Sequence, residues 1–121
     1  MPTPIDRPVI SVMKPGLRVF VSAGASGIGL AISEMLIRHG ARVHICDVAE
    51  THLAAFRKAH PGHGATLADV SDEAAVARLF GEVTASLGGL DALINNAGIA
   101  GPTGGVEEIS PADWRRCIDV C

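Results

Sequence analysis

The sequence Leu17-Arg18-Val19-Phe20-Val21-Ser22-Ala23-Gly24-Ala25-Ser26-Gly27-Ile28-Gly29 decides the fold. Residues 17–21 are mostly apolar and predict a buried strand. Residues 22–29 predict a tight turn, after which apolar residues recur at helical spacing up to Leu36, with Gly40 as the expected stop. A strand that leads through glycines into a helix is typical of folds that bind an anion at the helix N-terminus, where backbone N–H groups are free.

The same alternation of strands and helices continues along the chain. Because consecutive strands are separated by helices, they are expected to pair in parallel, with helices on both faces of the sheet. We therefore predict a doubly wound α/β fold of partial strand order 3-2-1-4 over residues 17–121, and an irregular arm over the proline-rich residues 1–16. The other predicted elements are strands 43–46, 65–68 and 90–94, a helix over 51–60, a helix from its N-cap Ser71 to Leu87, and a helix with Ser110 as N-cap and Pro111 in the first position.

The composition is that of a globular protein, with 48% hydrophobic and 19% charged residues. A net charge of -3 and the lack of any Lys/Arg cluster predict no nucleic-acid partner. Cys46, Cys117 and Cys121 have neither disulfide-framework nor metal-ligand spacing, which favours a reducing cytoplasm, and the histidines form no metal-binding pattern. The apolar run 9–13 is too short to cross a membrane, so no membrane partner is expected.

Two aspartates follow predicted strands. Asp47 ends the second strand about 20 residues beyond the glycines, where an acid can accept the ribose hydroxyls of adenosine. The alternative is that Asp47 caps the following turn and that Glu50 completes a capping box. Asp69 follows the third strand. Its chemistry alone fits a ligand contact and a turn or helix cap about equally well.

The glycine-rich turn resembles the Thr-Gly-x-x-x-Gly-x-Gly fingerprint of short-chain dehydrogenases/reductases. Ser22 stands at the Thr position, Ala23 at the first Gly, and Gly27 and Gly29 at the other two. Ala23 departs from that pattern, and we expect Gly24 to supply the missing flexibility one residue later. Asn95-Asn96-Ala97-Gly98, after the fourth predicted strand, matches the family's Asn-Asn-Ala-Gly motif.

This resemblance implies a Rossmann-like fold and hydride transfer between NAD and an alcohol or ketone substrate. Asp47 is then expected to bind ribose and to favour NAD over NADP, because its carboxylate repels a 2′-phosphate. Asp69 would bind the adenine amino group, and the Asn-Asn-Ala-Gly segment would line the adenosine side. The residues expected to contact the dinucleotide are Ser22, Ala23, Ser26, Gly27, Ile28, Gly29, Asp47, Asp69, Val70, Asn96, Ala97 and Gly98.

The family's catalytic residues have no counterpart in these 121 residues. There is no tyrosine for the Tyr-x-x-x-Lys motif, Lys14 and Lys58 lie outside any matching motif, and Cys121 occupies the position of the family's Asn. We therefore expect a truncated dinucleotide-binding domain without catalytic residues, derived from an oxidoreductase but inactive by itself. One alternative is a non-catalytic NAD-binding or interaction module that associates, as a homo-oligomer or with an intact relative, through the exposed sheet edge around Leu93 and Ile94 and through the last helix. The other is a truncated gene product without a stable fold or activity.

Overall fold

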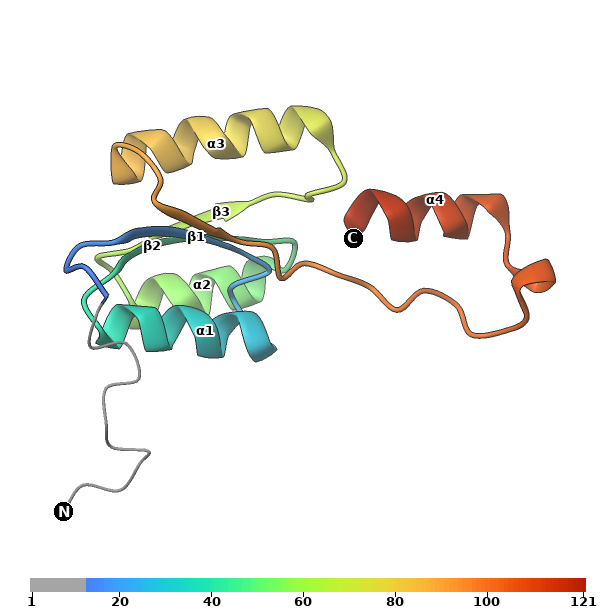
Figure 1. Ribbon diagram of the computed structural model, residues 1–121, viewed down its shortest axis with the longest axis horizontal. Helices are drawn as coiled ribbons and strands as arrows, with labels where there is room; N and C mark the ends of the chain where they lie inside the picture. The colour runs from blue at the N-terminus through green and yellow to red at the C-terminus, as the bar shows by residue number, and fades with distance from the viewer. Residues whose placement is uncertain (1–12) are drawn as a thin grey trace, which may run out of the picture.

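A computed structural model describes residues 13–121 (Figure 1). The predicted arm over 1–16 therefore lies mostly outside the described residues. The four strands are parallel and follow the order β3-β2-β1-β4, which confirms the predicted doubly wound arrangement. The elements are β1 (Arg18–Ser22), α1 (Gly27–Arg38), β2 (Arg42–Asp47), α2 (Glu50–Ala59), β3 (Gly64–Leu67), α3 (Glu73–Leu87), β4 (Ala92–Ile94), the 3-10 turn η1 (Val106–Glu108) and α4 (Pro111–Val120).

Helices cover both faces of the sheet, with α1 and α2 on one side and α3 on the other (Figure 1). Successive side chains of a strand point to opposite faces, so β1 and β2 must supply apolar residues to both layers. Val19 and Val21 of β1 pack in the α1/α2 layer, whereas Phe20 packs with Leu79 in the α3 layer. This two-sided burial is why the central strands contain near-continuous apolar runs.

The start of α3 corrects one prediction. Asp72, and not Ser71, is the N-cap, and its side chain accepts hydrogen bonds from the backbone N–H groups of Ala74 and Ala75. Ser71 instead donates its hydroxyl to Asp69 Oδ1 at 2.7 Å. Aspartate and serine are about equally good caps, so the identity of the residues does not choose between two neighbouring candidates. The choice follows from the tight turn that Asp69 and Ser71 form at the end of β3.

Helix α4 lies apart from the helix layers, at the end of a long loop (Figure 1). Ser110 is its N-cap and accepts a hydrogen bond from the Asp113 N–H at 3.1 Å, with Pro111 in the first turn, as predicted. No residue of α4 is buried, and Trp114 and Ile118 are exposed. Within residues 13–121, no helix is long and apolar enough to span a membrane.

Candidate dinucleotide site

The turn between β1 and α1 brings a free helix N-terminus to the carboxyl edge of the sheet. Ser26 is the N-cap of α1, but its side chain caps no backbone N–H, and the first turn of the helix contains no acidic residue. Among residues 13–121, no side chain accepts a hydrogen bond from the first N–H groups of α1, and such a terminus favours an anion. A side chain at Gly27 would meet no atom within 4 Å, so the space beside this terminus is open. Ile28 is exposed there as well.

The structure corrects the expected role of Gly24. Ala23 itself adopts the left-handed conformation, with φ +52°, so the flexibility is not moved to the next residue. Gly24 is needed for a different reason, because a Cβ on it would lie 2.6 Å from the side chain of Ile45. The turn therefore packs directly against β2, and Ala23 keeps a conformation that normally favours glycine.

Asp47 joins the glycine-rich turn to the end of β2. Its Oδ2 accepts the Ala25 N–H at 3.2 Å, and its Oδ1 accepts the N–H groups of Val48 at 2.8 Å and Ala49 at 3.1 Å. Three of about four acceptor positions of the carboxylate are thus filled, which leaves one on Oδ2. The turn-capping alternative is partly confirmed, but its capping box is wrong, because Ala49 is the N-cap of α2 and Glu50 pairs with Arg57.

Asp69 lies in the loop after β3 and accepts hydrogen bonds from its own loop and from α4. Its Oδ1 accepts the backbone N–H of Ser71 at 2.9 Å and the Ser71 hydroxyl at 2.7 Å, while its Oδ2 accepts from Arg116 of α4 at 3.2 Å. The hydrogen bonds from Ser71, together with the weaker effect of Arg116, lower the pKa of Asp69. The carboxylate therefore stays ionised at neutral pH and acts only as an acceptor.

The Asn95–Gly98 segment is fixed to the glycine-rich turn by Ser22. The Ser22 hydroxyl accepts the N–H groups of Asn96 and Ala97, both at 2.9 Å. In return, the Asn96 amide donates to the carbonyls of Ser22 and Ala23, both at 3.2 Å. Two motifs more than 70 residues apart in the sequence thus form one hydrogen-bonded unit. The sequence indicated both motifs but not the bonds between them.

These elements surround a cavity of about 110 Å³. It brings together six of the predicted residues and leaves Ser22, Asn96 and the start of α1 outside its lining. Sequence reasoning missed the other six lining residues, which are Cys46, Val48, Ala68, Ile99, Arg116 and Val120. No sequence pattern indicated that Arg116 belongs to the site, because only the folded chain brings α4 beside Asp69. The predicted residues in the lining are Ala23, Asp47, Asp69, Val70, Ala97 and Gly98.

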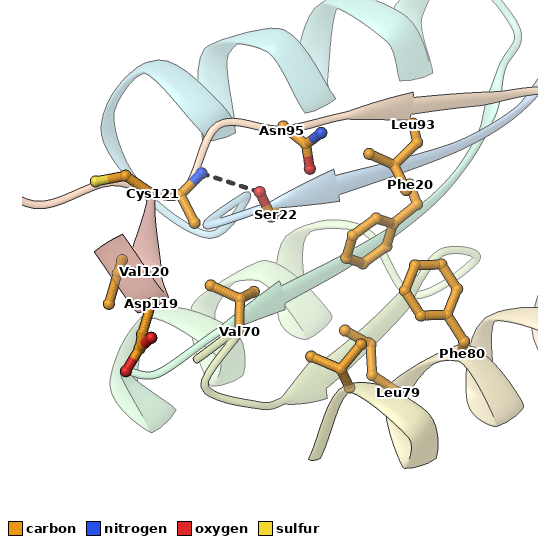
Figure 2. Close-up of a pocket in the computed structure, with 12 residues that line it drawn as sticks. Phe20, Ser22, Val70, Leu79, Phe80, Leu93, Asn95, Asp119, Val120 and Cys121 are labelled. Carbon is orange, nitrogen blue, oxygen red and sulfur yellow. Dashed lines mark hydrogen bonds between the residues drawn. The ribbon is translucent and has the colours of Figure 1, made fainter. Parts of the chain in front are cut away.

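A larger cavity of about 330 Å³ lies on the α3 side of the sheet (Figure 2). Its walls are mainly apolar, with Phe20 and Phe80 in tilted contact at a centroid distance of 5.5 Å. Ser22 and Asn95 border it at the strand ends, and Cys121 lines it from the α4 side (Figure 2). Because neither Asp47 nor Asp69 lines this space, the acidic groups and the glycine-rich turn meet at the smaller cavity.

Comparisons with known proteins agree with this architecture. The family profile of short chain dehydrogenases matches residues 18–121. Cis-4-hydroxycyclohexanecarboxylate dehydrogenase of Sinomonas cyclohexanicum is 44% identical over 105 residues, which cover 83% of this chain and 41% of that protein. A short chain dehydrogenase/reductase of Macrophomina phaseolina, dpmpG, is 36% identical over 110 residues, which cover 87% of this chain and 63% of that protein.

Solved structures show the same likeness. A 3-ketoacyl-(acyl-carrier-protein) reductase from Brucella melitensis, complexed with NADH, superposes with a TM-score of 0.82 at 26% identity, over 88% of this chain and 44% of that one. A Serratia marcescens short-chain dehydrogenase/reductase mutant gives a TM-score of 0.80 at 34% identity, over 88% and 45%. The chain therefore spans less than two thirds of the length of each of these proteins. It belongs to the short-chain dehydrogenase family.

Proposed function

We propose that this chain holds the adenosine half of NAD, within a protein that transfers a hydride between NAD and an alcohol or ketone carbon. The observation that carries the proposal is the position of Asp47, which lines the cavity and whose carboxylate accepts an N–H of the glycine-rich turn. Family membership supports a nicotinamide dinucleotide, and one structural neighbour was solved with NADH. The nicotinamide supplies the hydride chemistry when bound, and the residues described here bind and orient the adenosine.

The residues present fit such a ligand at two points. The N-terminus of α1 lacks a side-chain cap and has open space beside Gly27, which suits the diphosphate. The N-terminus of α3 differs, because Asp72 caps its first N–H groups. Beside the α1 terminus, Asp47 retains one acceptor position for a ribose hydroxyl.

A preference for NAD over NADP follows from the charges around the cavity. Asp47 is only 8% exposed, so a 2′-phosphate brought beside its carboxylate would meet weakly screened repulsion. Arg116 is the basic residue in the cavity lining, and its guanidinium already bonds to Asp69 and Ser71. We therefore expect NADP to bind at least about tenfold more weakly than NAD.

Calorimetric titration of the polypeptide 1–121 tests this proposal. NAD and ADP-ribose should bind with similar affinities, because both present the same adenosine diphosphate. Asp47→Asn should reduce the discrimination against NADP, whereas Asp72→Asn, a matched change at an N-cap outside the cavity, should leave it intact. Equal affinities for NAD and NADP in the unchanged chain would contradict the role of Asp47.

We further propose that the polypeptide 1–121 has no turnover by itself. The family resemblance assigns proton transfer to a tyrosine, and these residues contain none. Incubation with NAD and a broad panel of alcohols should give no NADH absorbance. Formation of NADH above the rate of a sample without protein would refute this expectation.

A second candidate function is a non-catalytic interaction module. Leu93 at the β4 edge is 42% exposed, and Trp114 and Ile118 of α4 are 46% and 69% exposed. Exposed apolar side chains on an edge strand and on a helix without buried residues favour self-association. Sedimentation velocity over a range of concentrations distinguishes the two candidates. Concentration-dependent dimers without NAD binding would favour the module, and a monomer that binds NAD would exclude it.

A further inference from the structure

A polar cluster ties α4 to the edge of the candidate adenosine cavity. Arg116 Nη1 donates to the Ser71 hydroxyl oxygen at 2.6 Å and to Asp69 Oδ2 at 3.2 Å. The Ser71 hydroxyl donates a hydrogen bond to Asp69 Oδ1 at 2.7 Å, and the Ser71 N–H donates to the same oxygen. Asp69 and Arg116 both line the cavity, so this cluster forms part of its wall. Its three side chains come from the β3–α3 loop and from α4.

The cluster leaves Asp69 with a defined hydrogen-bonding capacity. An ionised carboxylate offers about four acceptor positions, and both positions on Oδ1 are taken by Ser71. Arg116 takes one position on Oδ2, so a single position remains on that oxygen. Without Arg116, Asp69 would be held only from its own loop, and Oδ2 would have no donor. The guanidinium of α4 therefore holds the carboxylate oxygen that Ser71 does not bind.

This fixed acceptor suits one class of base. A purine with an amino group at position 6 presents a donor to the remaining position on Oδ2, whereas a 6-oxo purine presents an acceptor and repels it. On the basis of the proposed adenosine site, we propose that Arg116 is a positioning residue, which holds Asp69 so that the cavity selects 6-amino over 6-oxo purine dinucleotides. Arg116 acts through Asp69 and Ser71.

The solvent exposure of Arg116 and Asp69 indicates that their ion pair contributes little to the stability of the fold. The Arg116 and Asp69 side chains are 51% and 39% exposed, and ion pairs this accessible to water contribute little to folding. Removal of the guanidinium should therefore change base selection more than stability. Arg115 provides a matched control, because it is the neighbouring arginine on α4 and does not line the cavity.

Calorimetric titration with two dinucleotides tests the proposal. The probes are NAD and its 6-oxo analogue, nicotinamide hypoxanthine dinucleotide, titrated into the polypeptide 1–121 and its variants. The unchanged chain and Arg115→Gln should prefer NAD by about tenfold or more, the value of one hydrogen bond to a charged acceptor. Arg116→Gln should reduce that preference to within about threefold, and Arg116→Lys should restore part of it, since lysine keeps the charge but not the planar fork. Thermal melting by circular dichroism checks that each variant is folded.

The results distinguish three claims, which are the positioning role of Arg116, base selection by Asp69 and the adenosine site itself. If Arg116→Gln weakens both dinucleotides by the same factor, Arg116 is only a structural tether and the inference is wrong. If the unchanged chain binds both dinucleotides equally well, the adenosine site stands and base selection by Asp69 is overturned. If the unchanged chain binds neither dinucleotide, the proposed function fails together with the inference.

Discussion

Replacement of Ser22 by alanine tests how the two halves of the site are held together. The Ser22 hydroxyl, at the end of β1, accepts the N–H groups of Asn96 and Ala97 at 2.9 Å each. Ser22→Ala removes the only side-chain oxygen at this position and leaves both N–H groups without that acceptor. The change therefore removes two of the four hydrogen bonds that join the glycine-rich turn to the Asn-Asn-Ala-Gly segment, and the Asn96 amide still donates to the Ser22 and Ala23 carbonyls. It alters no residue that lines the smaller cavity.

The magnitude follows from these two hydrogen bonds. A backbone N–H that loses its partner away from water costs about 1–3 kcal/mol. Ser22 is buried but Asn96 and Ala97 are partly exposed, so water can reach them and the lower end of that range applies. We expect a loss of about 2–3 kcal/mol in the free energy of unfolding. The melting temperature should fall by about 10 °C.

Urea unfolding followed by far-ultraviolet circular dichroism measures this loss. Ser33→Ala is the matched control, because Ser33 is also buried and its hydroxyl donates to the Gly29 carbonyl at 2.8 Å. That bond is an additional contact within one turn of α1, so the control should cost less than about 1 kcal/mol. A Ser22→Ala loss below about 0.5 kcal/mol, or one no larger than the Ser33→Ala loss, would refute the proposed link.

Three further predictions follow from the same site and its core. Ala23→Gly should raise the free energy of unfolding by about 1 kcal/mol, measured by urea unfolding, because Ala23 has φ +52° and glycine adopts this conformation without a Cβ penalty. Gly29→Ala should abolish NAD binding in calorimetry and lower the melting temperature, because its Cβ would overlap the Ala23 carbonyl oxygen. Burial lowers the pKa of His44 below its ordinary value of 6.5, so the unfolded chain takes up that proton at a higher pH than the folded chain does. The free energy of unfolding should therefore fall as the pH decreases below about 6.5, and His44→Gln should flatten that slope in urea titrations between pH 8 and 5.5.

The sheet and its helices were predictable because their patterns are local and agree with one another. The apolar residues of β1, the glycines after it and the spacing of α1 each indicate the same strand–turn–helix unit. The repeat of that unit then sets the parallel pairing and the strand order. The position of Asp47 at the end of β2 followed from the same pattern, whereas its binding of ribose stays a prediction.

Other features of the site depend on contacts that no local pattern records. The N-cap of α3 is Asp72 and not the predicted Ser71, because the Ser71 hydroxyl bonds to Asp69 instead of to the helix. The left-handed conformation of Ala23 follows from the packing of the next residue against β2 and not from its own preference. Arg116 reaches Asp69 across 47 positions of sequence, and an exposed arginine on a helix usually has no specific partner.

The central claim is that the carboxyl edge of this sheet binds adenosine diphosphate between the glycine-rich turn and the two strand-end aspartates. Titration of ¹⁵N-labelled polypeptide with ADP-ribose, followed by amide NMR, tests it most directly. We predict saturable shifts of the amides of residues 25–29, 48–49, 69–71 and 96–98, and little change on the far ends of α2 and α3. Absence of shifts at millimolar ADP-ribose, or shifts centred on the larger cavity beside Phe80, would contradict the claim.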